Sequence, residues 1–356
     1  MIRLKSILVR LFMSVFVAGA LAAFFMINST KPRVLVLHSY ETEYSWTRDI
    51  NVTLRRDLAA KPYLMRWHYM DTKRNPDEAF KQRAGLLSRR IIGEWQPDVV
   101  IAVDDDAQRY AARYFVNHPK IKIVFAGING HLEPYGYGEA ANVTGILERK
   151  QWRGVKHLIT ESVRPRVPAE RPVRIAYLGD TSGSVQEDTK FLEEFDWKPH
   201  VLHRYKLVKT FDEWKAEVQR ANQEADVLIT TNYRRIQISA DDAKKFVPPE
   251  ELVKWTEDHT LRVPVIGTNG FYVEEGGMMA IGTSPFEHGR VAARMTIRII
   301  DENASPKSIK IESTQQFIPY MRAERLAQNN FVVPQVYESF ARAMNNYNES
   351  GKKMPQ

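Results

Sequence analysis

The three consecutive aspartates Asp104, Asp105 and Asp106 are the side chains whose type and spacing first suggest chemistry. They directly follow an apolar, β-branched run at residues 99–103, which predicts a strand buried on both faces. Carboxylates at the end of such a strand can hold a cationic group of a ligand. They can alternatively cap the following helix, because aspartate in a first turn accepts free N–H groups. One cap suffices, so at least one carboxylate is expected to remain available for a ligand.

A second polar cluster is expected at the same edge of the sheet. Apolar residues at helical spacing in 107–115 predict a helix, and residues 121–125 predict another buried strand. These elements form a βαβ unit, whose parallel strands end at a common edge. Gly127 and Asn129 follow the second strand. Since ligands of open parallel sheets bind beyond the carboxyl ends of the strands, this edge is the predicted ligand mouth.

Polar and aromatic residues follow the other predicted strands in the same way. The predicted ligand-binding set is Ser39, Tyr40, Trp46, Asp104, Asp105, Gly127 and Asn129 from the first half, and Asp180, Thr181, Ser182, Thr231, Asn232, Asn269 and Phe271 from the second. Hydroxyls, amides and backbone N–H groups would hold a carboxylate, an aspartate would hold an ammonium group, and the aromatic rings would enclose an apolar portion. An amino acid or similar small zwitterion fits this mixture. The alternative is that these loop residues only make turns and caps.

The alternation of strands and helices predicts an α/β protein with two doubly wound lobes and a cleft between them. A break containing Pro165, Pro168 and Pro172 separates the two halves. The predicted strands are 33–40, 64–71, 99–103, 121–125, 173–178, 201–208, 227–230, 263–266 and 309–311, and the main predicted helices are 76–95, 107–115, 211–224, 291–300 and 323–329.

The composition excludes several kinds of site. The chain has no cysteine, so disulfides, a thiolate nucleophile, cysteine zinc sites and a lipid-modified cysteine are ruled out. The formal net charge of +8 comes from 51 basic and 43 acidic residues that are interleaved along the chain, so nucleic acid is not an expected partner. No nucleophile elbow, zinc-protease motif or Walker loop occurs, and we expect no catalytic residue, metal or cofactor.

The first 31 residues predict an export signal or a membrane anchor. Arg3, Lys5 and Arg10 precede an uncharged apolar segment at 11–27, which is near the lower length limit for crossing a bilayer. A small-residue cleavage pattern occurs at Ala20-Leu21-Ala22, so the segment can be interpreted either as a cleaved signal or as a retained anchor. The basic residues keep that end cytoplasmic, so the remainder is expected in the periplasm, with the inner membrane as a partner if the segment stays uncleaved.

The order of several motifs resembles the type I periplasmic substrate-binding proteins, in particular the ABC-transporter substrate-binding family that includes tryptophan and tyrosine binders. The motifs are NVTG at 142–145, PVIG at 264–267, GMMAIG at 277–282, HGRVAARM at 288–295, ASPKSI at 304–309 and AERLAQNNFVVP at 323–334. The resemblance implies that the chain crosses between the lobes three times, with hinge strands at 142–146, 277–282 and 309–317. The implied division is 1–31 signal or anchor, 32–145 with 279–308 as lobe 1, 146–278 with 309–340 as lobe 2, and 341–356 as a C-terminal tail.

The function implied by the resemblance is that of an extracytoplasmic solute-binding receptor without catalysis. It would close its lobes over a small polar ligand and present it to the permease of an ABC transporter. A sensor with the same lobes, acting on a separate membrane signalling protein, is the alternative within the same fold. A periplasmic cleft enzyme is the alternative from another class.

Overall fold

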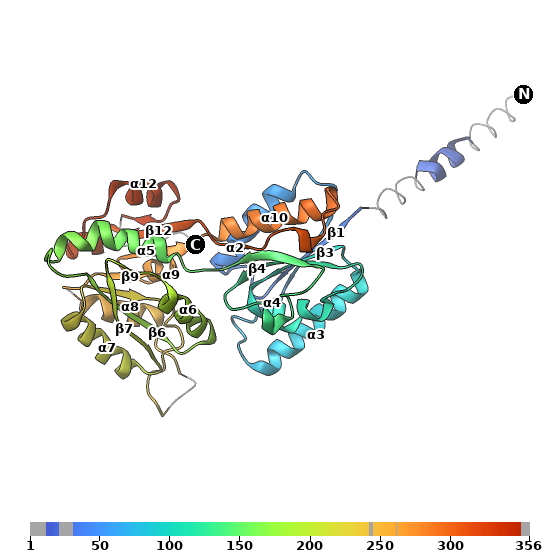
Figure 1. The fold of residues 1–356 in the computed structure, drawn as a ribbon. Coiled ribbons are helices and arrows are strands. Elements are labelled where there is room, and N and C mark those ends of the chain that lie inside the picture. Colours follow the sequence, from blue (N-terminus) through green and yellow to red (C-terminus); the bar gives the residue numbers. More distant parts are fainter. Residues whose placement is uncertain (1–11, 21–30, 242–244, 261, 350–356) are drawn as a thin grey trace, which may run out of the picture.

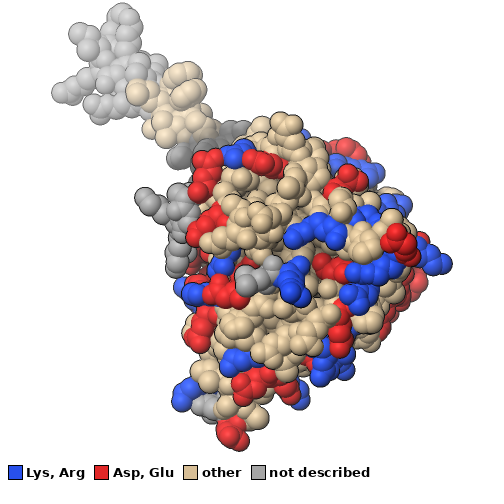
Figure 2. Space-filling model, turned by 90° about the vertical axis from the view of Figure 1, so that its left-hand side faces the viewer, with Lys and Arg blue, Asp and Glu red and all other residues tan. Residues whose placement is uncertain are grey.

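The computed structural model describes residues 12–20, 31–241, 245–260 and 262–349, and it contains two α/β lobes side by side (Figure 1). Most of the predicted signal or anchor segment lies outside these residues; within it, residues 12–20 are helical. No helix in the described ranges has the length and apolar character needed to cross a bilayer. On the face shown in Figure 2, acidic and basic side chains are interspersed among uncharged ones.

Six parallel strands form the sheet of lobe 1. In pairing order they are β11 (Glu312–Ser313), β5 (Val143–Leu147), β4 (Lys122–Ile128), β3 (Val99–Val103), β1 (Arg33–His38) and β2 (Leu64–Tyr69). Alternate residues of β1 point to opposite faces, so Val34 and Val36 join one apolar core while Leu35 and Leu37 join the other. The first core is covered by α2 (Ser45–Leu58) and α10 (Pro285–Asp301), and the second by α3 (Glu78–Trp95) and α4 (Asp104–Tyr110). Both faces are therefore buried, as the unbroken apolar strands predicted.

Seven strands form the sheet of lobe 2, which is parallel except where β10 meets β12. In pairing order they are β13 (Tyr347–Asn348), β12 (Phe317–Arg322), β10 (Met279–Thr283), β9 (Val265–Gly267), β8 (Val227–Thr230), β6 (Arg174–Asp180) and β7 (Val201–Val208). One face is covered by α5 (Trp152–Leu158), α6 (Gly183–Glu194) and α12 (Gln335–Ala343), and the other by α7 (Phe211–Glu224), α8 (Pro249–Asp258) and α9 (Phe271–Glu274). Each lobe thus has its own pair of cores.

Three short segments connect the lobes: β5 to α5, β10 to α10, and β11 to β12. Thr314, in the third segment, touches the other two. Its N–H donates to the Leu147 carbonyl at 3.0 Å, its hydroxyl accepts from the Arg149 N–H at 3.3 Å, and the same oxygen lies 3.0 Å from His288 Nε2. The three predicted crossings are present, and they meet at this threonine.

The pairing of β10 and β11 corrects the predicted lobe boundaries. β10 lies in the sheet of lobe 2, between β9 and β12, although residues 279–308 were assigned to lobe 1. β11 pairs with β5 in lobe 1, although residues 309–340 were assigned to lobe 2. Strand pairing joins segments far apart in the chain, so local patterns do not reveal it.

Several predicted elements are also corrected. Residues 306–308 form a 3-10 turn and the strand begins at Glu312, so the strand predicted at 309–311 was wrong. The helix predicted at 107–115 breaks at Ala111, after α4, and continues as a 3-10 turn. After α11 (Ala323–Gln328), the helix α12 begins in the part assigned to lobe 2 and extends into the region assigned as a tail, which also contains β13. Tyr337 and Ala341 of α12 are buried in the core of lobe 2.

The packing of α10 on α2 gives a test of lobe 1. A Cβ at Gly289 of α10 would lie 2.0 Å from Thr53 Oγ1 and 2.5 Å from the Ile50 carbonyl oxygen, and the carbonyl cannot move without shifting α2. We expect Gly289→Ala to lower the free energy of unfolding by about 1–3 kcal/mol, the usual cost of overpacking. Gly93→Ala on α3, where a Cβ meets nothing within 4 Å, is the matched control and is expected to be neutral or stabilising. Urea unfolding measures both, and equal stability of the two variants would contradict the tight helix contact.

Candidate functional site

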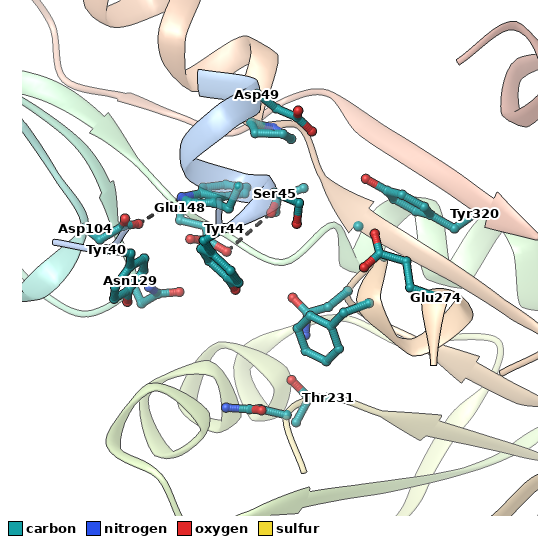
Figure 3. Close-up of a pocket in the computed structure, with 18 of the residues that line it drawn as sticks. Tyr40, Tyr44, Ser45, Asp49, Asp104, Asn129, Glu148, Thr231, Glu274 and Tyr320 are labelled. Carbon is teal, nitrogen blue, oxygen red and sulfur yellow. Dashed lines mark hydrogen bonds between the residues drawn. The ribbon is translucent and has the colours of Figure 1, made fainter. Parts of the chain in front are cut away.

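A cleft with a cavity of about 230 Å³ lies between the lobes and is lined by residues of both (Figure 3). Its lobe 1 wall comes from the exits of β1, β3 and β4, and its lobe 2 wall comes from the exits of β8 and β9, from α6 and from β12. The strand exits of the two sheets therefore face one another. The cavity is smaller than the roughly 300–1,000 Å³ typical of drug-sized ligands, so it suits a small molecule.

Three aromatic side chains, Tyr40, Tyr44 and Trp46, contribute to the lobe 1 wall. The Tyr40 and Tyr44 rings meet edge to face at 5.4 Å, and the Lys73 ammonium lies 4.7 Å from the centre of each. Trp46, at the start of α2, donates its indole N–H to Asp104 Oδ1 at 2.9 Å. Figure 3 draws this bond, with Tyr40 and Tyr44 beside it. The wall thus offers rings to an apolar or cationic ligand portion and a carboxylate behind them.

Asp104 is buried and its backbone is left-handed, with φ of 65°. Its carboxylate rests against Gly127, where a Cβ would lie 2.7 Å from Asp104 Oδ1, so glycine is required there. The other carboxylate oxygen, Oδ2, has no hydrogen-bond partner among the described residues. Burial, and then the charges of Glu148 and Asp105, raise the pKa of Asp104 well above its usual range. A buried acid with a free oxygen is suited to receive a cation from a ligand.

The capping alternative for the three aspartates is wrong. The N-terminus of α4 has no side-chain capping hydrogen bond from its N-cap residue. The free N–H of Ala107 in its first turn donates instead to the hydroxyl of Ser39 at 2.8 Å. Asp105 accepts from Asn129 Nδ2 at 3.1 Å and from the Tyr135 hydroxyl at 2.6 Å. Asp106 pairs with Lys81 at 3.0 Å. Each carboxylate therefore makes contacts outside its own helix.

A buried lysine forms the floor of the cleft where β5 crosses to α5. Lys150 donates to Asn269 Oδ1 at 2.8 Å and lies 3.6 Å from Glu148 Oε1 and 3.8 Å from Asp188 Oδ2. Burial lowers the pKa of its ammonium, but Asp188 and Glu148 together outweigh burial, so the pKa lies above its ordinary value. Burial raises the pKa of Asp188 to about 6. This network ties the crossing segment to two elements of lobe 2, α6 and the β9 exit.

The lobe 2 wall combines aromatic, amide and charged groups. Arg234 pairs with Glu275, and its guanidinium lies 4.2 Å from the centre of the Phe271 ring. Tyr320 of β12 and Glu274 at the end of α9 face the cleft beside them (Figure 3).

Nine of the fourteen predicted ligand residues line the cleft: Tyr40, Trp46, Asp104, Asp105, Asn129, Thr231, Asn232, Asn269 and Phe271. Ser39 and Gly127 lie behind it, and their contacts hold α4 and Asp104 in place. Asp180 is buried and accepts from the Ser182 hydroxyl and from the Arg235 N–H at 3.0 Å. Ser182 lines an adjoining groove of about 730 Å³, and Thr181 does not line the cleft. Direct contact of any of these residues with a ligand remains a prediction.

Sequence reasoning missed several lining residues: Tyr44, Ser45, Glu148, Lys150, Asp188, Arg234, Glu274 and Tyr320. Glu148, Lys150 and Arg234 each lie a few residues beyond a predicted strand, so a wider search of the strand exits could have found them. Asp188 lies within α6 and Tyr320 within β12, and no local signal marks either one. Across the described ranges, no group of three His, Asp or Glu side chains could hold a metal ion.

Substitution of the buried Lys150 is predicted to lower the stability of the protein by an amount that depends on pH. Lys150→Met leaves Glu148 and Asp188 buried without their cation, and removing one partner of a buried pair costs about 3–5 kcal/mol. We expect that loss in urea unfolding at pH 7.5 and a smaller one at pH 5. The raised pKa of Asp188 lets it take up a proton as the pH falls, which removes the unpaired charge. Lys150→Met with Asp188→Asn should recover part of the loss at pH 7.5. If Lys150→Met alone is as stable as the parent at pH 7.5, the ion-pair network is not required for stability.

Comparison with solved structures shows the same fold in substrate-binding proteins. A conserved domain protein from Vibrio cholerae is 17% identical, with a TM-score of 0.62 over 90% of this chain and 100% of the other. A Streptococcus pneumoniae ABC domain in complex with L-Trp is 14% identical, with a TM-score of 0.59 over 87% and 98% of the two chains. A ligand-free, open substrate-binding protein with adhesive properties from Clostridium difficile is 12% identical, with a TM-score of 0.63 over 85% and 96%. The TM-scores and coverages show a shared type I periplasmic-binding fold.

No curated protein matches the sequence significantly. Residues 63–326, which include most of both lobes, match the family described as ABC transporter substrate binding protein. The family is one of substrate-binding proteins. Because the match spans more than half of the sequence and the structure has the corresponding two-lobed fold, the chain belongs to the ABC transporter substrate-binding protein family.

Proposed function

We propose that this protein is an extracytoplasmic receptor that closes its lobes over a small polar ligand, an amino acid or a similar compound, and presents it to an ABC transporter. The observation that supports the proposal is the cleft itself, whose walls come from the strand exits of both lobes. A ligand that contacts both walls favours the closed form by the difference between its affinities for the two forms.

The three crossing segments are the parts that have to deform during closure. Each lobe keeps its own cores, so neither depends on the other for its packing. The contacts of Thr314 bring the three segments together at one place, which favours rotation of the lobes about that place.

The transporter is the proposed partner, and a separate membrane signalling protein is the alternative. Family membership supports the transporter. Loss of uptake of the identified ligand after disruption of the gene would support transport. Normal uptake with loss of a transcriptional or motility response to the ligand would support sensing instead.

Ligand-dependent closure tests the receptor directly. Mass spectrometry of small molecules released from the purified, denatured full chain identifies a ligand, which is then added back at saturating concentration. Small-angle scattering should show a smaller radius of gyration, and the melting temperature should rise by mass action while the circular dichroism spectrum stays the same. An unchanged radius with bound ligand would contradict closure and favour a rigid pocket.

A pair of tyrosine variants locates the binding. Tyr44→Ala removes a ring from the cleft and should weaken ligand binding by about 1–2 kcal/mol, because aromatic contacts contribute beyond their buried area. Tyr114→Ala, at a side chain that is 57% exposed and does not line the cleft, is the control and should bind as the parent does. Calorimetric titration measures both affinities. Equal affinities would place the ligand elsewhere.

A further inference from the structure

Two of the four cationic side chains that line the cleft are paired with carboxylates of the cleft itself. Lys150 lies between Glu148 and Asp188, and Arg48 lies 3.2 Å from Asp49. These positive charges are therefore largely neutralised before any ligand binds.

Of the other two cations, one is paired with a carboxylate and the other contacts only aromatic rings. Arg234 pairs with Glu275, just outside the cavity lining. The Lys73 ammonium lies over the Tyr40 and Tyr44 rings at 4.7 Å and makes no ion pair within 4 Å among the described residues. Lys73 is thus the cation of this wall that a ligand carboxylate could still reach.

On the acidic side, Asp104 lacks a matching cation. Its side chain is only 2% exposed, it lines the cleft, and it accepts one bond from Trp46 through Oδ1 while Oδ2 has no partner. Burial, together with the charges of Glu148 and Asp105, raises the pKa of Asp104. Lys73 opposes that shift at longer range without pairing with the carboxylate. A ligand cation placed against Asp104 would supply the partner that Oδ2 lacks.

Asp105 also lacks a cation, but Asn129 and Tyr135 donate hydrogen bonds to its two carboxylate oxygens. Glu274 is the other acid of the cleft without a matching cation, and it belongs to the other lobe. It ends α9 and is exposed to the cleft, and its carboxylate has no hydrogen bond or ion pair within the described part of the chain. Burial raises its pKa, while Arg234 lowers it from a distance. Figure 3 shows Asp104 and Glu274 at opposite sides of the cleft, with Tyr44 and Ser45 between them in that view.

We infer that the ligand carries two cationic groups, one bound by Asp104 of lobe 1 and the other by Glu274 of lobe 2. The inference rests on the proposed receptor function and specifies its substrate class. A dication that joins the two acids would draw the lobes together, because each end neutralises a carboxylate of a different lobe. The rings of Tyr40, Tyr44 and Tyr320 line the same cleft and favour cations at their faces, and Tyr44 lies between the two acids in the view of Figure 3.

Two kinds of small molecule share this chemistry. A linear diamine has two ammonium groups and nothing else that needs a partner. A basic amino acid has the same two cationic groups and a carboxylate, for which Lys73 is the remaining cation.

Matched pairs of ligands test the inference by calorimetric titration of the purified full chain. The probes are diamines of increasing length, each with the monoamine of the same length, and lysine with norleucine, which lacks the side-chain amine. We expect at least one dication to bind about tenfold or more tightly than its monocationic partner, the usual gain from a bond to a charged group. Stronger binding of a diamine identifies the diamine class, and stronger binding of lysine identifies the basic amino acids.

Conservative variants assign the two charges to their carboxylates. Glu274→Gln should remove the preference for a dication over its monocationic partner. Asp104→Asn should weaken binding of both members of a pair about tenfold or more, and asparagine keeps an acceptor for Trp46 and tolerates the left-handed backbone. Glu94→Gln removes the same charge from an exposed pair on α3 and should leave every affinity as in the parent.

Three outcomes would overturn the inference. They are equal affinity for every dication and its partner, a preference that survives Glu274→Gln, and failure of all the dications to bind at millimolar concentration. If the lobes close on a zwitterionic ligand that lacks a second cation, the inference fails and the receptor function stands. If a dication binds with the expected preference and the radius of gyration does not change, the charge assignment stands and closure fails.

Discussion

The arrangement of the cleft depends on the buried Lys150. An ammonium group cannot leave water without anions and acceptors around it, so its position requires Glu148 on the same segment, Asp188 of α6 and Asn269 after β9. The contacts join the first crossing between the lobes to two separate parts of lobe 2. These contacts fix the position of the residues at the floor of the cleft without a ligand, and the other lining residues surround this floor.

Movement between the lobes is confined by the same region. The crossings are short, and Thr314 bonds to residues next to both of the others. The cores of each lobe contain residues from that lobe's own sheet and covering helices, so rotation of one lobe against the other leaves them packed. Polar contacts at the crossings can shift by small amounts at little cost, whereas a shared apolar core would resist rotation. This construction suits the proposed closure of the lobes over a ligand.

In the lobe 1 wall, the backbone at Asp104 adopts an unusual conformation that places its carboxylate at the site. Asp104 has a left-handed backbone although it is neither glycine nor asparagine, and it places its carboxylate in the space left by Gly127. Such a conformation persists only where the surroundings hold it, and here Trp46 and the packed β3 exit do so. The cost of a strained, buried and half-satisfied carboxylate is a reason to look for its partner in a ligand.

The sequence by itself determined most of the strands and helices and the edge of the sheet where the site lies. Apolar runs and helical spacing depend on near neighbours in the chain, and parallel strands place their exits together, so Tyr40, Asp104 and Asn232 could be assigned to the cleft in advance. The resemblance to a known family added the three crossings. It did not show that β10 and β11 pair outside the lobes assigned to them, because pairing joins distant segments.

Only the tertiary structure decided which charges are matched. Lys150 and Asn269 are 119 residues apart in the chain, and Asp104 and Glu274 come from different lobes. Whether an acid is neutralised, capped or left open depends on which side chains the fold brings within a few ångströms of it. Local sequence carries no record of those distances, so it left open whether the three aspartates cap a helix or line the ligand mouth. In the folded protein Asp104 and Asp105 line the cleft and Asp106 pairs with Lys81. The same physical reason explains why Asp188, Glu274 and Tyr320 were found only in the folded protein.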